Sequence, residues 1–248
     1  MFMKNFSKFL KKFSNLLPSG FKPKFITGND LLRWHQEQGV LYSASIIRDN
    51  KATKIQRMFS RSGIRELYIN CSFNNYQIEH EGHKKVLHAA HRYAKEFNDN
   101  ISSFVFLGNP GTGKNHLAAA ICNYLILRNK SVLIVTVADL MSSMKSTFNV
   151  YNNLSEEYLL RNFSTVDLLI IDEIGVQIQS RYEKIVINQI VDRRSSSKKS
   201  TGMLSNLNYL KLRTLLGKRV IDRMCLGKGL WLNFNWSSYR KKVNVNEC

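Results

Sequence analysis

The chain has 248 residues, of which 44% are hydrophobic and 22% are charged, and this composition argues against a wholly disordered protein. Its formal net charge of +19 favours a phosphate-rich partner, nucleic acid or an anionic membrane surface, although codon usage in an A+T-rich genome is an alternative source of lysine. Four widely spaced cysteines (Cys71, Cys122, Cys225 and Cys248) form no CxxC pair, which argues against a zinc site or disulfide framework and indicates a reducing cytoplasm.

The N-terminal segment carries two helical patterns. In the first, apolar residues recur at helical spacing among lysines until Pro18-Ser19-Gly20 stops the pattern. The interrupting lysines distinguish it from the continuous apolar region of a secretory signal. A second helix is expected from about Asn29 to a hinge at Arg61-Ser62-Gly63. The apolar positions of the first helix are Phe2, Phe6, Phe9, Leu10, Phe13, Leu16 and Leu17.

About sixty residues of helix form only a small core, so part of their apolar surface is expected to bind a partner. Two alternatives remain at this point. The helices could bury their apolar faces against each other, or the basic first helix could bind lipid. The longest apolar stretches have the length of strands, so we expect no transmembrane helix and no membrane partner.

From about Ile64 onward, strand-like and helical patterns alternate. Apolar strand-like runs occupy residues 104–107, 132–136, 168–171, 202–205 and 230–234, and helical patterns such as 115–128 and 182–194 separate them. This alternation predicts an α/β fold with a parallel sheet that helices cover on both faces.

A phosphate-binding loop follows the first of these strands and opens a helix, which is the context that such a loop requires. Its glycines allow backbone N–H groups to face an anion, and the helix N-terminus adds partial positive charge. The lysine at its end is expected to reach the outer phosphates of a nucleotide. The loop consists of Gly108, Asn109, Pro110, Gly111, Thr112, Gly113 and Lys114.

The residue after Lys114 departs from the usual pattern. This position normally holds Ser or Thr, whose hydroxyl ligates Mg²⁺, but here it is Asn115. An amide oxygen can also ligate Mg²⁺, although it lies one bond further from the backbone. We therefore expect nucleotide binding to survive and hydrolysis to be slow.

Two further strands end in polar residues. Residues 166–173 form a buried strand that ends in Asp172 and Glu173, which is typical of a Walker B element. Asp172 is expected to hold Mg²⁺, and Glu173 to act as general base on the attacking water. Residues 202–206 end in Asn206, which is expected to orient this water or contact the γ-phosphate. The alternatives are a helix N-cap for the acidic pair and a turn for Asn206.

The chain resembles the DnaC/DnaI/IstB-like family of AAA+ ATPases, whose helicase-loader branch acts with a DnaB-type replicative helicase. The resemblance extends over essentially the whole chain, and its motifs are Gly108 to His116 (GNPGTGKNH), the following LAAAICN, IDEIGV at 171–176, NQIVDRRSSSK, RVIDRM and Asn70-Cys71-Ser72-Phe73. It implies a helical helicase-binding domain at 1–60, a linker at 61–72 and an AAA+ P-loop NTPase domain at 73–248. Asn115 and His116 then belong to the nucleotide site together with the loop.

The resemblance also implies functions for two arginines near the C-terminus. Arg223, in the RVIDRM motif, matches an arginine finger that completes the site of a neighbouring subunit, and Arg219 lies one helical turn away. Arg240 matches the sensor-2 arginine that contacts nucleotide. The sequence ends eight residues after Arg240, so we expect no C-terminal helical lid.

For DNA, the matching positions are Phe148, Ser180 and Tyr182. An aromatic ring can stack on any base, and the nearby Lys145, Arg181 and Lys184 could meet phosphates. Core packing is the alternative for Phe148. The implied function is an ATP- and Mg²⁺-dependent loader that binds helicase and single-stranded DNA and self-associates. A transposition helper ATPase of the IstB-like branch, a small-molecule kinase and a non-hydrolysing DNA-binding module are the alternatives.

Overall fold

The computed structural model describes residues 28–97, 101–147, 155–176 and 180–239. The chain divides into two compact units, Met1–Lys54 and Ile55–Cys248. The amphipathic helix expected within residues 2–17 lies outside the described residues, as do Phe148 and Arg240. None of the helices in the described ranges combines the length and the apolar character that a membrane crossing needs.

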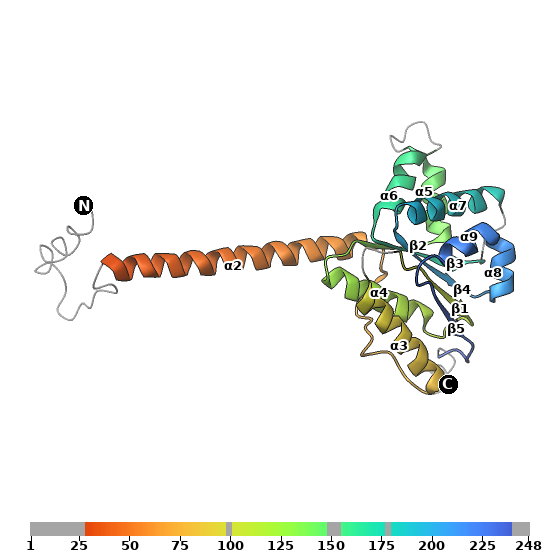
Figure 1. Cartoon of the computed structure of the whole chain (residues 1–248), viewed down its shortest axis with the longest axis horizontal. Helices are drawn as coiled ribbons and strands as arrows, with labels where there is room; N and C mark the ends of the chain where they lie inside the picture. The colour runs from red at the N-terminus through yellow and green to blue at the C-terminus, as the bar shows by residue number, and fades with distance from the viewer. Residues whose placement is uncertain (1–27, 98–100, 148–154, 177–179, 240–248) are drawn as a thin grey trace, which may run out of the picture. The chain divides into compact units, whose positions relative to one another are not determined.

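Helix α2 (Gly28–Arg61) is the second helix expected from the sequence, and it ends at the predicted hinge (Figure 1). It contains no proline, and Asp30 in its first turn and Arg61 in its last turn complement the helix dipole. Within the first unit its apolar side chains are largely in solvent: Val40 and Tyr42 are each 70% exposed and Leu41 is 62% exposed. The described part of this unit, from Gly28 onward, therefore presents apolar side chains to solvent.

The second unit is built on a parallel sheet of five strands, as the sequence predicts. The strand order is β2-β3-β4-β1-β5, and every pairing is parallel. In this order the carboxyl ends of β1, β3 and β4 lie at one edge, where bound ligands are found in open α/β sheets. The strands are β1 (Phe104–Gly108), β2 (Val132–Thr136), β3 (Leu168–Ile174), β4 (Ser200–Ser205) and β5 (Leu230–Phe234).

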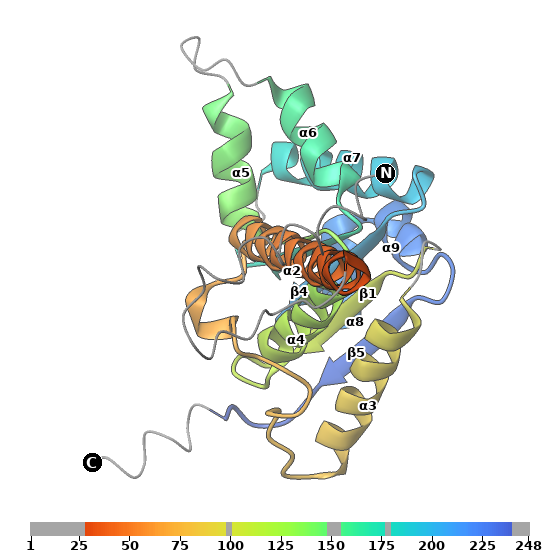
Figure 2. The same ribbon diagram turned by 90° about the vertical axis from the view of Figure 1, so that its left-hand side faces the viewer.

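Helices cover both faces of the sheet, because successive side chains of each strand point to opposite faces. Phe104 and Phe106 of β1 pack with α3 (Glu81–Glu96) and α4 (Lys114–Leu127), whereas Val105 and Leu107 face the other helical layer. Figures 1 and 2 show these layers on either side of the sheet. The second layer consists of α5 (Val137–Ser146), α6 (Glu156–Thr165), α7 (Arg181–Ser196), α8 (Tyr209–Leu216) and α9 (Lys218–Met224).

A buried arginine fixes the second layer to the sheet. The Arg194 side chain is fully buried, and its guanidinium donates to Thr201 Oγ1 at 3.1 Å and to the carbonyls of Phe163 and Val166 at 2.8 and 3.0 Å. It also donates to the carbonyl of Ser200. A buried charge is tolerated when its donors are satisfied in this way. Arg194 thereby connects α7 to the starts of β3 and β4, the two strands that end at the candidate site.

Candidate nucleotide-binding site

The loop after β1 has the geometry of an anion cradle. Gly113, the residue before α4, adopts a left-handed conformation with φ of 94°. A Cβ at this position would also lie 2.8 Å from the ring of Tyr76, so only glycine fits. The Thr112 hydroxyl donates to the carbonyl of Asn109 at 2.7 Å and closes the loop. The unpaired N–H groups at the start of α4 thus face the space where a phosphate would bind.

Lys114 is buried at the base of this loop. Only 5% of the residue is exposed, and its ammonium donates to the carbonyls of Gly108 at 2.7 Å and Asn109 at 2.6 Å. Burial lowers the pKa of Lys114 to about 8, and the nearby negative charge of Asp172 partly opposes this effect. The loop carbonyls therefore hold the ammonium close to the cradle, where phosphate oxygens can replace them as hydrogen-bond acceptors.

This lowered pKa predicts a pH dependence of ATP binding. Bound phosphates favour the protonated form of Lys114. Above the pKa of Lys114 in the free protein, ATP binding must therefore be accompanied by uptake of a proton. We expect ATP affinity, measured without magnesium by calorimetry, to be constant below pH 8 and to fall above it, by roughly tenfold per pH unit at most. Lys114→Arg keeps its charge throughout and should give a flat profile, whereas a flat wild-type profile would contradict the lowered pKa.

Asn115 and Asp172 lie together although 57 residues separate them in the sequence. The amide of Asn115 donates to Asp172 Oδ2 at 2.7 Å, and the backbone N–H of Glu173 donates to Asp172 Oδ1 at 2.7 Å. Burial raises the pKa of Asp172, and these two hydrogen bonds and the charge of Arg65 act against this increase.

This pair fits a magnesium ion that arrives with a nucleotide. Mg²⁺ takes oxygen ligands, and in nucleotide sites one or two protein groups are supplemented by phosphates and water. Asp172 offers a carboxylate and Asn115 an amide oxygen at the mouth of the cradle. No group of three or more His, Cys, Asp or Glu side chains in the described ranges could hold a metal on its own.

Glu173 adopts a strained backbone conformation beside Asn115 and Asp172. Its φ is 61°, in the left-handed region, and the pairing of β3 with β4 shifts register between Ile171 and Ile174. A bulge of this kind redirects a side chain, and such strain often occurs at functional sites. The exposed Glu173 side chain lines the nucleotide cavity. The helix-cap alternative for the acidic pair is wrong, because both residues belong to β3 and Ser180 caps the next helix, α7.

A cavity of about 360 Å³ brings most of the predicted site residues together. Its wall contains the loop residues from Pro110 onward, the acidic pair and Asn206, which follows β4. Gly108 and Asn109 contribute through the carbonyls that hold Lys114. The predicted residues in the wall are Pro110, Gly111, Thr112, Gly113, Lys114, Asn115, His116, Asp172, Glu173 and Asn206.

An aromatic wall that sequence patterns did not predict completes this cavity. Tyr76, His83 and Trp236 all line it, and the rings of His83 and Trp236 are 4.5 Å apart between centroids. The Trp236 indole N–H donates to the carbonyl of Thr112 at 3.1 Å, and the Tyr76 hydroxyl donates to the same carbonyl at 3.5 Å. The only sequence signal near this wall is the Asn70–Phe73 motif that precedes Tyr76.

The segment after β5 also contacts the loop. The Asn109 amide donates to the carbonyl of Trp236 at 3.2 Å, and the backbone N–H of Tyr239 donates to the carbonyl of Gly111 at 3.0 Å. Ser237 and Tyr239 line the cavity. The chain thus reaches the phosphate-binding loop one residue before Arg240, which lies outside the described residues.

Arg223 lies on α9, away from the cavity of its own chain. It forms an ion pair with Asp192 of α7, and its guanidinium donates to Ser195 Oγ at 2.8 Å. Arg219 pairs with the same carboxylate at 2.5 Å. Among the described residues, none of α9 lines the nucleotide cavity.

The two described positions of the predicted DNA site lie at the start of α7. Ser180 is the N-cap of this helix, where its side chain and that of Glu183 form a capping box. Tyr182 is half-buried, and its ring packs against the core of the second helical layer. Burial and the nearby Glu156 raise the pKa of Tyr182.

Comparisons with known proteins agree with this fold. Residues 44–246 match the family of IstB-like ATP binding proteins. The chain is 68% identical over 245 residues to the replicative helicase loader DnaC of Buchnera aphidicola subsp. Baizongia pistaciae (strain Bp), and 58% identical over 245 residues to that of Escherichia coli (strain K12). Each alignment covers 99% of this chain and 100% of the relative.

Solved structures show the same fold. A crystal structure of the DnaC helicase loader matches with a TM-score of 0.60 at 20% identity, covering 69% of this chain and 100% of that one. A crystal structure of DnaI matches with a TM-score of 0.58 at 23% identity, covering 70% and 93%. Together with the full-length identities above, these matches show that the chain belongs to the DnaC family of replicative helicase loaders, within the IstB-like ATP binding proteins.

Proposed function

We propose that the chain binds ATP with Mg²⁺ at this cavity and delivers a DnaB-type replicative helicase onto single-stranded DNA. One observation carries the proposal: Lys114, Asp172 and Glu173 surround a single cavity at the carboxyl edge of the sheet. The relatives named as replicative helicase loaders align over their full length, which favours a helicase over a transposase as partner. We place the protein in the cytoplasm.

Each site residue has its own role in the proposed hydrolysis of ATP. Lys114 exchanges the loop carbonyls for the outer phosphates, and the start of α4 surrounds them with N–H groups. Asp172 and Asn115 would hold the Mg²⁺ ion, which supplies positive charge against the phosphate oxygens. Glu173 accepts a proton from the attacking water, which Asn206 orients. An amide in place of a hydroxyl at position 115 keeps this reaction slow.

The aromatic wall beside the phosphate loop supports binding of the base of a nucleotide. Tyr76, His83 and Trp236 offer flat apolar surfaces, as nucleotide bases require, and the hydrogen bonds to the Thr112 carbonyl attach this wall to the phosphate loop. The presence of aromatic and charged side chains around one cavity favours a nucleotide over a small sugar or acid phosphate. It weakens the small-molecule kinase alternative.

Helix α2 supports the assignment of helicase binding to the N-terminal part. Val40, Leu41 and Tyr42 are all more than 60% exposed, so this part of α2 offers apolar side chains that a partner can bury. Binding through these side chains requires no nucleotide. ATP binding and hydrolysis would instead control the release of the loader once the helicase encircles the strand.

Leu41→Glu should weaken capture of the organism's replicative helicase by the full-length chain about tenfold or more, because it places a charge in an apolar contact. Titrating immobilised chain with purified helicase, without ATP, measures the effect. The matched control is Leu210→Glu on α8, since Leu210 is 69% exposed, similar to Leu41 at 62%. An equal loss of helicase affinity in both variants, or no loss in either, would show that α2 is not part of the helicase interface. Failure of the wild-type chain to bind helicase would contradict the loader proposal itself.

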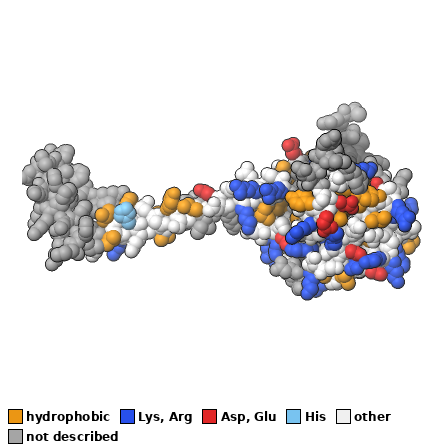
Figure 3. Space-filling view, turned by 90° about the horizontal axis from the view of Figure 1, so that it is seen from above, with side chains coloured by type: hydrophobic (Ala, Val, Ile, Leu, Met, Phe, Trp, Pro, Cys, Tyr) orange, Lys and Arg blue, Asp and Glu red, His pale blue; other side chains and the backbone are white. Residues whose placement is uncertain are grey.

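Binding of single-stranded DNA and self-association complete the proposed cycle. Figure 3 shows several patches of Lys and Arg side chains on the visible face of the second unit, with acidic and hydrophobic side chains between them. Such a surface attracts a phosphate backbone without reading its sequence. We assign Phe148, Ser180 and Tyr182 to the DNA site on the family resemblance, with Tyr182 contributing the part of its ring that the core leaves exposed. Arg223 would act at the subunit boundary.

A further inference from the structure

A short turn before α3 leads into the aromatic wall of the nucleotide cavity. We call residues 71–76 the entry turn. Within it, the backbone N–H of Ser72 donates to Asn75 Oδ1 at 2.8 Å, and the backbone N–H of Asn75 donates to Ser72 Oγ at 3.3 Å. The Asn75 amide also donates to the carbonyl of Asn70 at 2.8 Å. Asn75 and Tyr76 line the cavity, so the position of this compact turn decides where Tyr76 lies.

His116, in the first turn of α4, attaches the entry turn to the helix. Its Nε2 lies 3.1 Å from the carbonyl oxygen of Ser72 and 3.0 Å from Asn75 Oδ1. A carbonyl oxygen can only accept, so Nε2 carries the hydrogen and donates to both oxygens. The lone pair of Nδ1 then faces Cys71 Sγ, 3.5 Å away. Both ring nitrogens of His116 are therefore occupied by the entry turn rather than left for a nucleotide.

The direct contacts of Tyr76 with the phosphate-binding loop are weaker than the contacts of the entry turn with His116. The Tyr76 ring packs against Gly113, and its hydroxyl is 3.5 Å from the carbonyl of Thr112, at the long limit for a hydrogen bond. The ring also lies 5.4 Å from that of His116 between centroids. His116 thus contacts Tyr76 and also holds the turn before it, so the placement of Tyr76 depends mainly on His116.

The phosphate-binding loop is held by bonds of its own. The Thr112 hydroxyl donates to the carbonyl of Asn109 at 2.7 Å, and the Lys114 ammonium donates to two loop carbonyls. The Trp236 indole donates to the carbonyl of Thr112 at 3.1 Å. None of these bonds involves the entry turn, so a displaced entry turn leaves the loop in place.

We propose that His116 is a positioning residue for the base of the nucleotide: it holds the entry turn, and with it Tyr76, where the base binds. The inference rests on the proposed ATP site. A surface that is already in position does not have to be ordered when the ligand arrives, so more of the contact energy appears as affinity. The contribution of the base to ATP affinity therefore depends on His116, whereas the contribution of the triphosphate depends on Lys114 and the loop.

His116→Phe keeps a ring of similar size and removes both nitrogens. It should weaken ATP binding by the full chain roughly tenfold, about the value of one stacked base. Binding of inorganic tripolyphosphate, which has no base, should be unchanged. Calorimetric titration with each ligand in the presence of Mg²⁺ measures both affinities. Lys114→Ala should weaken the binding of both ligands, because it acts on the phosphates.

Two amide variants test the geometry if His116→Phe lowers the melting temperature. The amide nitrogen of His116→Gln can reach the position of Nε2, so this variant should bind ATP like the wild type. His116→Asn is one bond shorter and cannot reach the oxygens of Ser72 and Asn75. It should therefore lose ATP affinity and keep tripolyphosphate affinity, as His116→Phe does.

A double substitution tests whether His116 acts through Tyr76. Tyr76→Leu keeps apolar volume but removes the aromatic ring, so it should also weaken ATP binding and spare tripolyphosphate. If His116 acts by placing this ring, adding His116→Phe to Tyr76→Leu should cause little further loss of ATP affinity. A further loss as large as that in the wild-type background would contradict an action through Tyr76.

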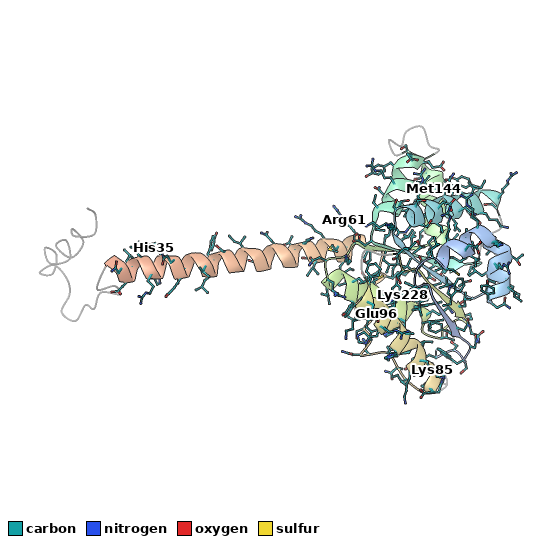
Figure 4. All side chains as sticks on the ribbon, in the orientation of Figure 1. His35, Arg61, Lys85, Glu96, Met144 and Lys228 are labelled. Carbon is teal, nitrogen blue, oxygen red and sulfur yellow. The ribbon has the colours of Figure 1, made fainter. Side chains whose placement is uncertain are left out.

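His88→Phe is the matched control. His88 lies on α3 between Lys85 and Glu96, which are labelled in Figure 4, and it is exposed and outside the nucleotide cavity. This variant should match the wild type with both ligands. If His116→Phe leaves ATP affinity unchanged, or weakens both ligands equally, the inference is overturned while the ATP site remains. If Lys114→Ala binds both ligands as the wild type does, the ATP site and the inference fail together.

Discussion

Lys114→Ala is expected to weaken ATP binding at least tenfold, or about 1.4 kcal/mol. The substitution removes the buried ammonium at the base of the phosphate cradle. In a buried site, the loss of this positive charge beside the phosphates costs more binding energy than it would in water. Calorimetric titration of the full chain with ATP and Mg²⁺ measures the effect. Helicase capture by the same variant should be unchanged, because the apolar surface on α2 belongs to a different compact unit.

Glu173→Gln separates binding from hydrolysis. Its side chain lines the cavity beside Asn115 and Asp172, so an amide there should leave ATP affinity intact and abolish phosphate release. Lys84→Ala provides a control for non-specific charge effects, since Lys84 is an exposed lysine on α3 that pairs only at the surface with Glu81. An unchanged ATP affinity in Lys114→Ala, with the fold intact by circular dichroism, would rule out the loop at 108–114 as the binding site.

The parts of this structure that depend on short-range sequence were predictable. All five strands of the ATPase unit were expected from apolar runs, and α4 and α7 begin and end within two residues of the predicted helical patterns. The loop from Gly108 to Lys114 is contiguous, so its chemistry is visible in a single motif. The pairing of Asn115 with Asp172 was also accessible, because the ends of parallel strands meet at one edge.

Other parts depend on distant segments and could not be predicted from local patterns. The aromatic wall combines Tyr76 and His83, which precede the loop, with Trp236, which follows the last strand. No periodicity relates such positions. The left-handed conformation of Glu173 is equally invisible, because glutamate has no preference for it and the bulge against β4 imposes it.

Arg223→Ala is expected to lower the DNA-stimulated ATPase rate of the assembled protein strongly. In GTPases an arginine that stabilises the charge on the transferring phosphoryl group contributes roughly 10³–10⁵ in rate. We expect a smaller effect here, because the amide of Asn115 is a weaker substitute for the usual hydroxyl at the proposed metal site. ATP affinity should change little, since no described residue of α9 lines the nucleotide cavity of its own chain. Phosphate release by the variant, at saturating ATP and single-stranded DNA, measures the loss.

The position of Arg223 makes a stronger test possible. Its guanidinium is held by Asp192 and Ser195, and no described residue of α9 lines the cavity, so in its own chain Arg223 would have to leave both partners to reach the nucleotide. Mixing Arg223→Ala chains with Lys114→Ala chains, each inactive alone, should therefore restore part of the ATPase. The intact arginine of a Lys114→Ala chain would complete the intact phosphate loop of its Arg223→Ala neighbour. If mixed assemblies form and no mixing ratio restores activity, Arg223 acts within its own chain, and its ion pair with Asp192 is its structural role.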